Sequence, residues 1–169
     1  MRAASDERAR VRGAQRGSVS DLEALFRTHW PRAYRAAYFV THDAGAAEDI
    51  AQESFLAAVR GLDRFDRRRP FGPWLHRIVV NRAIDWTRAR RLRSEVELSE
   101  ALPAPESRDA PGDDVLGTLA RLSPEHRAVV VMRYLLELTP GEIAEALDLP
   151  RGTVNSRLRR GLDALEEEL

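Results

Sequence analysis

The chain has 169 residues, enough for one domain or two small ones, and its 27 basic residues, all arginine, balance 27 acidic residues. The absence of cysteine excludes a disulfide framework, a thiolate metal site and a thiol redox switch. The N-terminus is charged rather than apolar, and no apolar run approaches the ~20 residues of a membrane span. We therefore expect a cytoplasmic protein without membrane insertion.

The zero net charge conceals blocks of opposite sign. Residues 1–17 carry a net charge of +3, residues 18–59 of −3, residues 60–93 of +8 and residues 94–115 of −6. Such asymmetry indicates a polyanionic partner. An acidic segment between basic ones is also expected to compete with DNA phosphates for the same arginines, because non-specific DNA binding is largely electrostatic.

The first half of the chain has helical periodicity, and we expect a flexible arm over residues 1–17 before a helical domain over residues 18–93. Pro31 is expected to break the first helix or to start the next one. Another helix begins after Asp43, with a polar face that includes Asp49. Its apolar side is expected to be buried and consists of Ala47, Ile50, Ala51, Phe55 and Val59.

A polar loop, DRFDRRRPFGP, precedes a helix expected from Trp74 to about Arg93. Loop and helix interleave aromatic rings with arginines, a combination that suits single-stranded nucleic acid because every base can stack on a ring. Trp74 heads an apolar stripe and is expected in the core. Phe65 and Phe71 are harder to explain as core residues in a polar loop, and they are candidates for stacking on unpaired bases.

Residues 94–112 contain three prolines and many acidic residues but no aromatic residue, which predicts a flexible linker. A second helical domain is expected over residues 113–169. A short helix lies around residues 115–120, Ser123 caps another, and Thr139 with Glu142 forms the capping box of a third. The expected fold class is all-α, with two small helical domains joined by a flexible linker.

The last two helices of the chain, separated by a tight turn, have the pattern of a helix-turn-helix whose second helix enters the major groove of DNA. Arginine can pair with guanine and asparagine with adenine, while threonine and serine reach bases or phosphates. The alternative is an ordinary amphipathic hairpin with a solvated basic face. The exposed candidate residues are Arg151, Thr153, Asn155, Ser156, Arg157, Arg159 and Arg160.

Three segments, in this order and spacing, resemble a bacterial sigma factor of the extracytoplasmic-function (ECF) group within the sigma-70 family. They are DIAQESF, FGPWLHRIVVNRAIDWTRARR and LSPEHRAVVVMRYLLELTPGEIAEALDLPRGTVNSRLRRG, and the resemblance covers roughly residues 18–93 and 113–165. It implies an alternative sigma factor for transcription initiation, not an enzyme. Such a factor binds core RNA polymerase, reads the −35 promoter element as duplex DNA, and melts and captures the −10 element.

The resemblance also implies roles for particular residues. The polymerase β′ clamp helices would contact Asp49, Gln52, Glu53 and Phe55, and the β flap is a second expected polymerase contact. The −10 element would be bound by Phe65, Arg67, Phe71, Arg77, Asn81, Asp85 and Arg88. The −35 element would be read by the recognition-helix residues named above, although the family commonly has lysine at the position of Asn155. An anti-sigma partner is implied as well, and no cofactor, metal or catalytic residue is expected.

Two other interpretations compete with a sigma factor. A stand-alone helix-turn-helix regulator would explain residues 113–169, but not the arginine-rich aromatic segment or the polymerase-docking pattern. A sigma-like decoy that blocks polymerase is disfavoured by the intact basic residues in both domains. An enzyme has little support, because the four histidines are isolated and no nucleophile motif or phosphate-binding loop is present.

Overall fold

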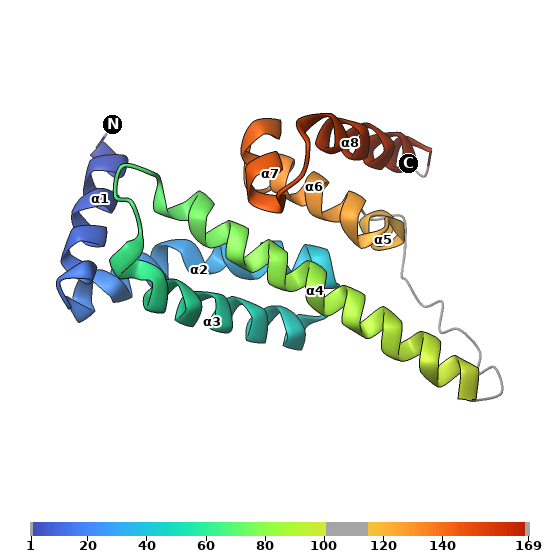
Figure 1. Cartoon of the computed structure of the whole chain (residues 1–169), viewed down its shortest axis with the longest axis horizontal. Helices are drawn as coiled ribbons and strands as arrows, with labels where there is room; N and C mark the ends of the chain where they lie inside the picture. The colour runs from blue at the N-terminus through green and yellow to red at the C-terminus, as the bar shows by residue number, and fades with distance from the viewer. Residues whose placement is uncertain (1, 101–114, 168–169) are drawn as a thin grey trace.

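The computed structural model describes residues 2–100 and 115–167, and these are helical and without strands (Figure 1). The N-terminal region consists of α1 (Arg2–Gln15), α2 (Val19–Thr41), α3 (Ala44–Gly61), the 3-10 turn η1 (Leu62–Arg64) and α4 (Phe71–Glu100). The C-terminal region consists of α5 (Val115–Arg121), α6 (Pro124–Tyr134), α7 (Pro140–Leu147) and α8 (Arg151–Glu166). The expected all-α class with two helical regions is confirmed. Across the described ranges, no helix is both long and apolar enough to cross a membrane.

Residues 2–15 are not the flexible arm that their charge predicted, because they form α1 and pack against α2. Val11 is only 2% exposed and joins the core of the N-terminal region. Gly13 allows a close approach, since a Cβ atom there would overlap the carboxylate of Asp21. A single well-placed apolar residue in a charged segment was too weak a pattern to predict this helix.

Other helix boundaries also differ from the prediction, and α4 begins at Phe71 rather than at Trp74. Pro31 lies inside α2 rather than at its end, because buried residues on both sides of it, Leu25 and Ala33, fix the helix in the same core. Helix α4 continues through residues 94–100, which were assigned to the linker, since the segment SEVELSE is compatible with a helix and the first proline comes only at Pro103. Residues 101–112, the rest of the predicted linker, lie outside the described residues.

The predicted caps of the C-terminal region are confirmed. The Ser123 hydroxyl accepts a hydrogen bond from the backbone N–H of His126 at 3.3 Å, and Thr139 and Glu142 form a reciprocal capping box at the start of α7. Buried Gly161 lets α8 approach α6, because a Cβ atom there would lie 2.9 Å from Val130 Cγ2. These local signals place the helix-turn-helix where the sequence predicted it.

The two regions pack against each other, with α6 beside α2 and α4 and with α7 beside α4 (Figure 1). Buried Arg127 of α6 links them through one guanidinium group. It donates hydrogen bonds to Val40 O at the C-terminal end of α2 and to three carbonyls at the end of α5, at distances of 2.6–2.9 Å. Burial lowers the pKa of Arg127 to about 10. Among the described residues no carboxylate pairs with it, so the negative ends of two helix dipoles surround its charge.

Candidate nucleic-acid interface

The two phenylalanines predicted in the arginine-rich loop belong to the core, and the second, Phe71, is already the first residue of α4. Phe65 is 8% exposed and Phe71 is 3% exposed, so the expectation that they stand outside the core is wrong. Their rings pack edge to face with centroids 5.9 Å apart, and the Phe65 ring lies 4.6 Å from that of half-buried Trp74. Sequence polarity was misleading, because the loop turns its polar residues outward and its rings inward. Arg67, in contrast, is exposed at the surface of the loop.

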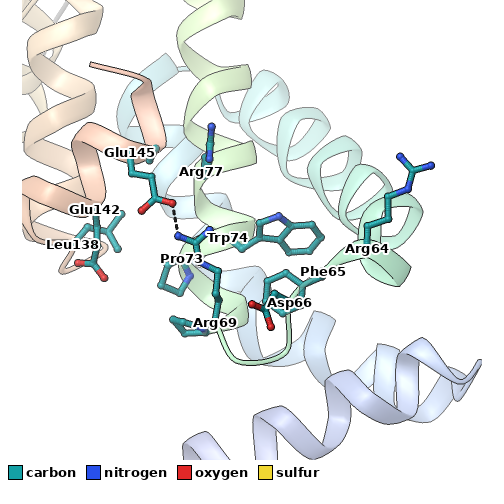
Figure 2. A pocket seen from close by; sticks show the side chains of 12 residues that line it. Arg64, Phe65, Asp66, Arg69, Pro73, Trp74, Arg77, Leu138, Glu142 and Glu145 are labelled. Carbon is teal, nitrogen blue, oxygen red and sulfur yellow. Dashed lines mark hydrogen bonds and ion pairs between the residues drawn. The ribbon is translucent and has the colours of Figure 1, made fainter. Parts of the chain in front are cut away.

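The loop and the start of α4 face α7 across a cavity of about 290 Å³ (Figure 2). Its basic wall includes Arg64, Arg69 and Arg77, and its acidic wall consists of Glu142 and Glu145 from α7. An ion pair joins Arg69 to Glu145 across the cavity. The carboxylates of the C-terminal region thus occupy positions where the loop could otherwise meet phosphates.

Four residues predicted to contact the −10 element lie on one face of α4, since Arg77, Asn81, Asp85 and Arg88 follow at steps of four, four and three. This face points toward the C-terminal region. Asn81 Nδ2 donates to Ala146 O of α7 at 3.1 Å, and Arg88 Nε lies 3.1 Å from a carboxylate oxygen of Glu125 in α6. Arg77 and Asp85 remain exposed. In this closed arrangement, part of the predicted −10 face is covered.

Helix α8 presents the predicted −35 residues at the surface. Arg151, Asn155, Arg159 and Arg160 are exposed, whereas Thr153, Ser156 and Arg157 are half-buried. Its first turn follows Pro150, whose side chain provides no cap, and the Thr153 N–H donates to Pro150 O at 2.9 Å, so the N–H groups of Arg151 and Gly152 are the ones that can face an anion. A groove of about 590 Å³ separates this turn from Glu125 and Arg88, and Thr153, Ser156, Arg157 and Arg160 line its recognition-helix side.

Helix α3 carries the residues predicted to bind polymerase. Asp49, Gln52 and Glu53 are exposed, and Glu53 pairs with Arg82 of α4 at 3.0 Å. Phe55 is buried, with its ring centroid 4.8 Å from that of Phe26. The exposed side chains of Asp49, Gln52 and Glu53 thus form a polar strip, and the buried ring of Phe55 lies on the core side of the same helix.

An exposed apolar groove of about 440 Å³ lies beside this polar strip, and the sequence did not predict it. Val59, expected to be buried, is 41% exposed, and Leu56 is 54% exposed. With Val19 and Phe26 of α2 they line the groove, and Gln52 of the polar strip lines it as well. Apolar residues in a helix are usually core residues, so only the offset of Leu56 from the buried stripe indicated this surface.

An all-α chain with an arginine-rich loop and a helix-turn-helix has the organisation of a promoter-recognition protein. The family model of sigma-70 region 2 matches residues 25–93, and that of sigma-70 region 4 matches residues 113–165. The chain therefore belongs to the sigma-70 family, among its ECF members, and it is an alternative sigma factor for promoter recognition. A stand-alone regulator is not favoured.

Named relatives agree with this assignment. The chain is 32% identical to the ECF RNA polymerase sigma factor SigW of Bacillus subtilis (strain 168), over 95% of each chain. It is 35% identical to the ECF RNA polymerase sigma factor SigL of Mycobacterium tuberculosis (strain ATCC 25618 / H37Rv), over 93% of each chain. Its fold is similar to that of CnrH, solved in complex with the cytosolic domain of CnrY, with a TM-score of 0.73, 28% identity and 96% of each chain covered.

Proposed function

We propose that three surfaces of the chain have separate roles in promoter recognition: one on α3 binds polymerase, one on the arginine-rich loop and α4 binds the −10 element, and one on α8 binds the −35 element. The strip of Asp49, Gln52 and Glu53, supported by Phe55, docks on the β′ clamp helices of core polymerase, and the adjoining apolar groove extends this contact. The C-terminal region contacts the β flap. The single observation that carries this proposal is the combination of an exposed polar strip and apolar groove on α3 with two separate basic surfaces, because a regulator that binds DNA alone needs no such strip and groove.

The −10 element is assigned to the arginine-rich loop and the exposed face of α4. Opening a promoter requires unstacking of base steps, which costs a few kcal/mol per step. Arg67 and Arg77 can hold the backbone of the separated strand, while Asn81, Asp85 and Arg88 contact base edges once the regions part. Buried Phe65 and Phe71 support the loop from below in the closed arrangement, and stacking on a base would require the loop to open.

The −35 element is assigned to α8, through Arg151, Thr153, Asn155, Ser156, Arg157, Arg159 and Arg160. Two weakly binding modules on one chain become selective when they engage two DNA elements together. We also propose an anti-sigma factor as a protein partner, and the similar protein CnrH was solved in complex with a second protein, the cytosolic domain of CnrY. The protein would act by binding rather than by catalysis, and in the cytoplasm, where polymerase and promoter DNA meet.

Run-off transcription tests the proposed function directly. Core polymerase would be combined with the full-length chain and a library of promoter fragments, and transcripts would be mapped at their 5′ ends. We expect new start sites that share −35 and −10 elements and that are absent with core polymerase alone. Sequence-selective DNA binding by the free chain, without any transcript start that depends on it, would instead support a stand-alone regulator.

The double substitution Asp49→Ala and Gln52→Ala is expected to weaken binding to core polymerase roughly tenfold, or ~1.4 kcal/mol. Both side chains are exposed, so the free energy of unfolding should change by no more than about 0.5 kcal/mol. Surface-immobilised core polymerase measures the affinity, and thermal melting measures the stability. Asp6→Ala, an exposed acid on α1, is the matched control. Unchanged affinity of the double variant would contradict the docking assignment.

Asn155→Ala and Arg157→Ala are each expected to cost about 1–3 kcal/mol of −35 discrimination, the typical value of a bidentate base contact. Competition between the consensus and single-base variants of the −35 duplex, measured with holoenzyme, gives this number. A side chain that touches only phosphate would instead weaken all duplexes alike and reduce the salt slope by about one. An Asn155→Lys variant with an unchanged −35 preference would show that Asn155 does not read a base.

A further inference from the structure

The N-terminal helix holds the arginine-rich loop through one side chain. Gln15, the last residue of α1, is half-buried, and its Nε2 donates to Leu62 O at 2.8 Å and to Phe65 O at 3.1 Å. Leu62 begins η1 and Phe65 directly follows it, so one amide group spans the turn that leads into the loop. These partners lie 47 and 50 residues away from Gln15 in the sequence.

The contact requires a donor at this position. Leu62 O already accepts the backbone N–H of Phe65 at 3.1 Å, whereas Gln15 is the one described donor to Phe65 O within the ranges that the structure covers. A carboxylate would repel both carbonyls, and an apolar side chain would leave Phe65 O without this donor. Gly17, with φ of +89°, turns the chain directly after α1 and fixes where this helix ends.

Phe65 directs the loop that follows. Its backbone is extended, and its ring is held against Trp74, so the hydrogen bond to its carbonyl group fixes the direction in which the loop leaves the core. Asp66 then accepts the backbone N–H of Arg68 at 3.0 Å, which shapes the turn that exposes Arg67. Gln15 therefore holds the backbone at Phe65, the residue from which the loop begins.

We propose that Gln15 is a positioning residue for −10 recognition, which orders the loop before the separated strand arrives. The inference rests on the proposed role of the loop in −10 binding. A loop held in its binding conformation loses less conformational entropy when it binds, and this gain appears as affinity. Gln15 precedes the segment that the region 2 model matches, residues 25–93, so α1 takes part in DNA recognition from outside that segment.

The test uses holoenzyme assembled from core polymerase and the full-length chain. Gln15→Met keeps the length of the side chain and removes both donors. Its affinity for a single-stranded −10 oligonucleotide is expected to fall about five- to thirtyfold, as for the loss of one or two hydrogen bonds. The fluorescence change of 2-aminopurine in the −10 element of a promoter should fall with it. Affinity for core polymerase and for a −35 duplex should be unchanged.

Two further variants separate positioning from general stability. Val11→Ala weakens the packing of α1 elsewhere and should lower the melting temperature without changing −10 affinity. Gln15→Lys restores an N–H donor, so its affinity for the −10 strand should exceed that of Gln15→Met. Each −10 affinity is divided by the affinity of the same variant for the −35 duplex. Wild-type −10 affinity in Gln15→Met, or equal losses in Gln15→Met and Val11→Ala, would overturn the inference. If wild-type holoenzyme itself binds no −10 strand, the proposed function fails instead.

Discussion

Substituting Arg127 by Met is expected to lower the free energy of unfolding by about 2–4 kcal/mol, because buried carbonyls at two helix ends lose their donor. Met keeps most of the aliphatic volume, so a cavity contributes little to this loss. For a chain of this length the melting temperature should fall by about 5–15 °C. Thermal and urea unfolding, followed by circular dichroism, provide the measurement.

Arg133→Met is the matched control for this prediction, because Arg133 lies on the same helix with its side chain exposed. Its effect should stay within about 0.5 kcal/mol. Arg127→Lys should fall between the two, since one ammonium group cannot reach carbonyls that the broad guanidinium spans. Equal melting temperatures for Arg127→Met and wild type would show that water or other groups satisfy these carbonyls equally well.

The double substitution Glu125→Arg and Glu145→Arg is expected to raise the affinity of the free chain for promoter duplex roughly tenfold. It removes two ion pairs and places new positive charges opposite Arg88 and Arg69, which repel them. These carboxylates pair with Arg88 and Arg69 and help to hold the predicted −10 face against the C-terminal region. The free wild-type chain should accordingly bind promoter duplex poorly. Fluorescence anisotropy with a labelled duplex measures the affinity. Energy transfer between labels on α1 and α8 measures the separation of the N-terminal region from the C-terminal region.

Added positive charge alone would also favour DNA, so the control must carry the same charge elsewhere. Glu23→Arg with Glu48→Arg changes two exposed acids on α2 and α3, away from the contact between the regions. The paired swap of Arg69→Glu and Glu145→Arg should restore the closed arrangement and should therefore leave the affinity for duplex DNA as low as that of the wild type. An increase in affinity no larger than that of the control would mean that the ion pairs do not limit access to DNA.

The sequence predicted several of the features that depend on neighbours in the chain, although α2 is capped by Ser18 and not by Ser20. The capping box at Thr139, the cap at Ser123 and the start of α3 after Asp43 are local patterns, and each was found. Exposure of Asp49 and Asn155 also followed from helical periodicity. The roles of these residues in binding polymerase and DNA stay predictions.

Features that depend on distant contacts were not predictable in this way. The rings of Phe65 and Phe71 are buried because they pack against each other and against Trp74, with His29 of α2 beside Phe71, and nothing in the composition of the loop indicates these contacts. Internal competition for arginines was expected from the acidic linker, whose residues 101–112 lie outside the described ranges. In the described part of that acidic segment Glu95 pairs with Arg91, and outside it Glu125 on α6 and Glu145 on α7 pair with Arg88 and Arg69.

Because the ion pairs Arg69–Glu145 and Arg88–Glu125 are exposed, ionic strength has two opposing effects on the affinity of the chain for DNA. Added salt screens the bonds of Arg69 and Arg88 to their glutamates and so favours separation of the two regions. The same salt weakens every contact with DNA phosphates through counterion release. The logarithm of the DNA affinity should therefore fall less steeply with the logarithm of salt concentration than the number of phosphate contacts implies. Salt also releases the arginines from their own carboxylates, and this release offsets part of the affinity that salt removes from the complex with DNA.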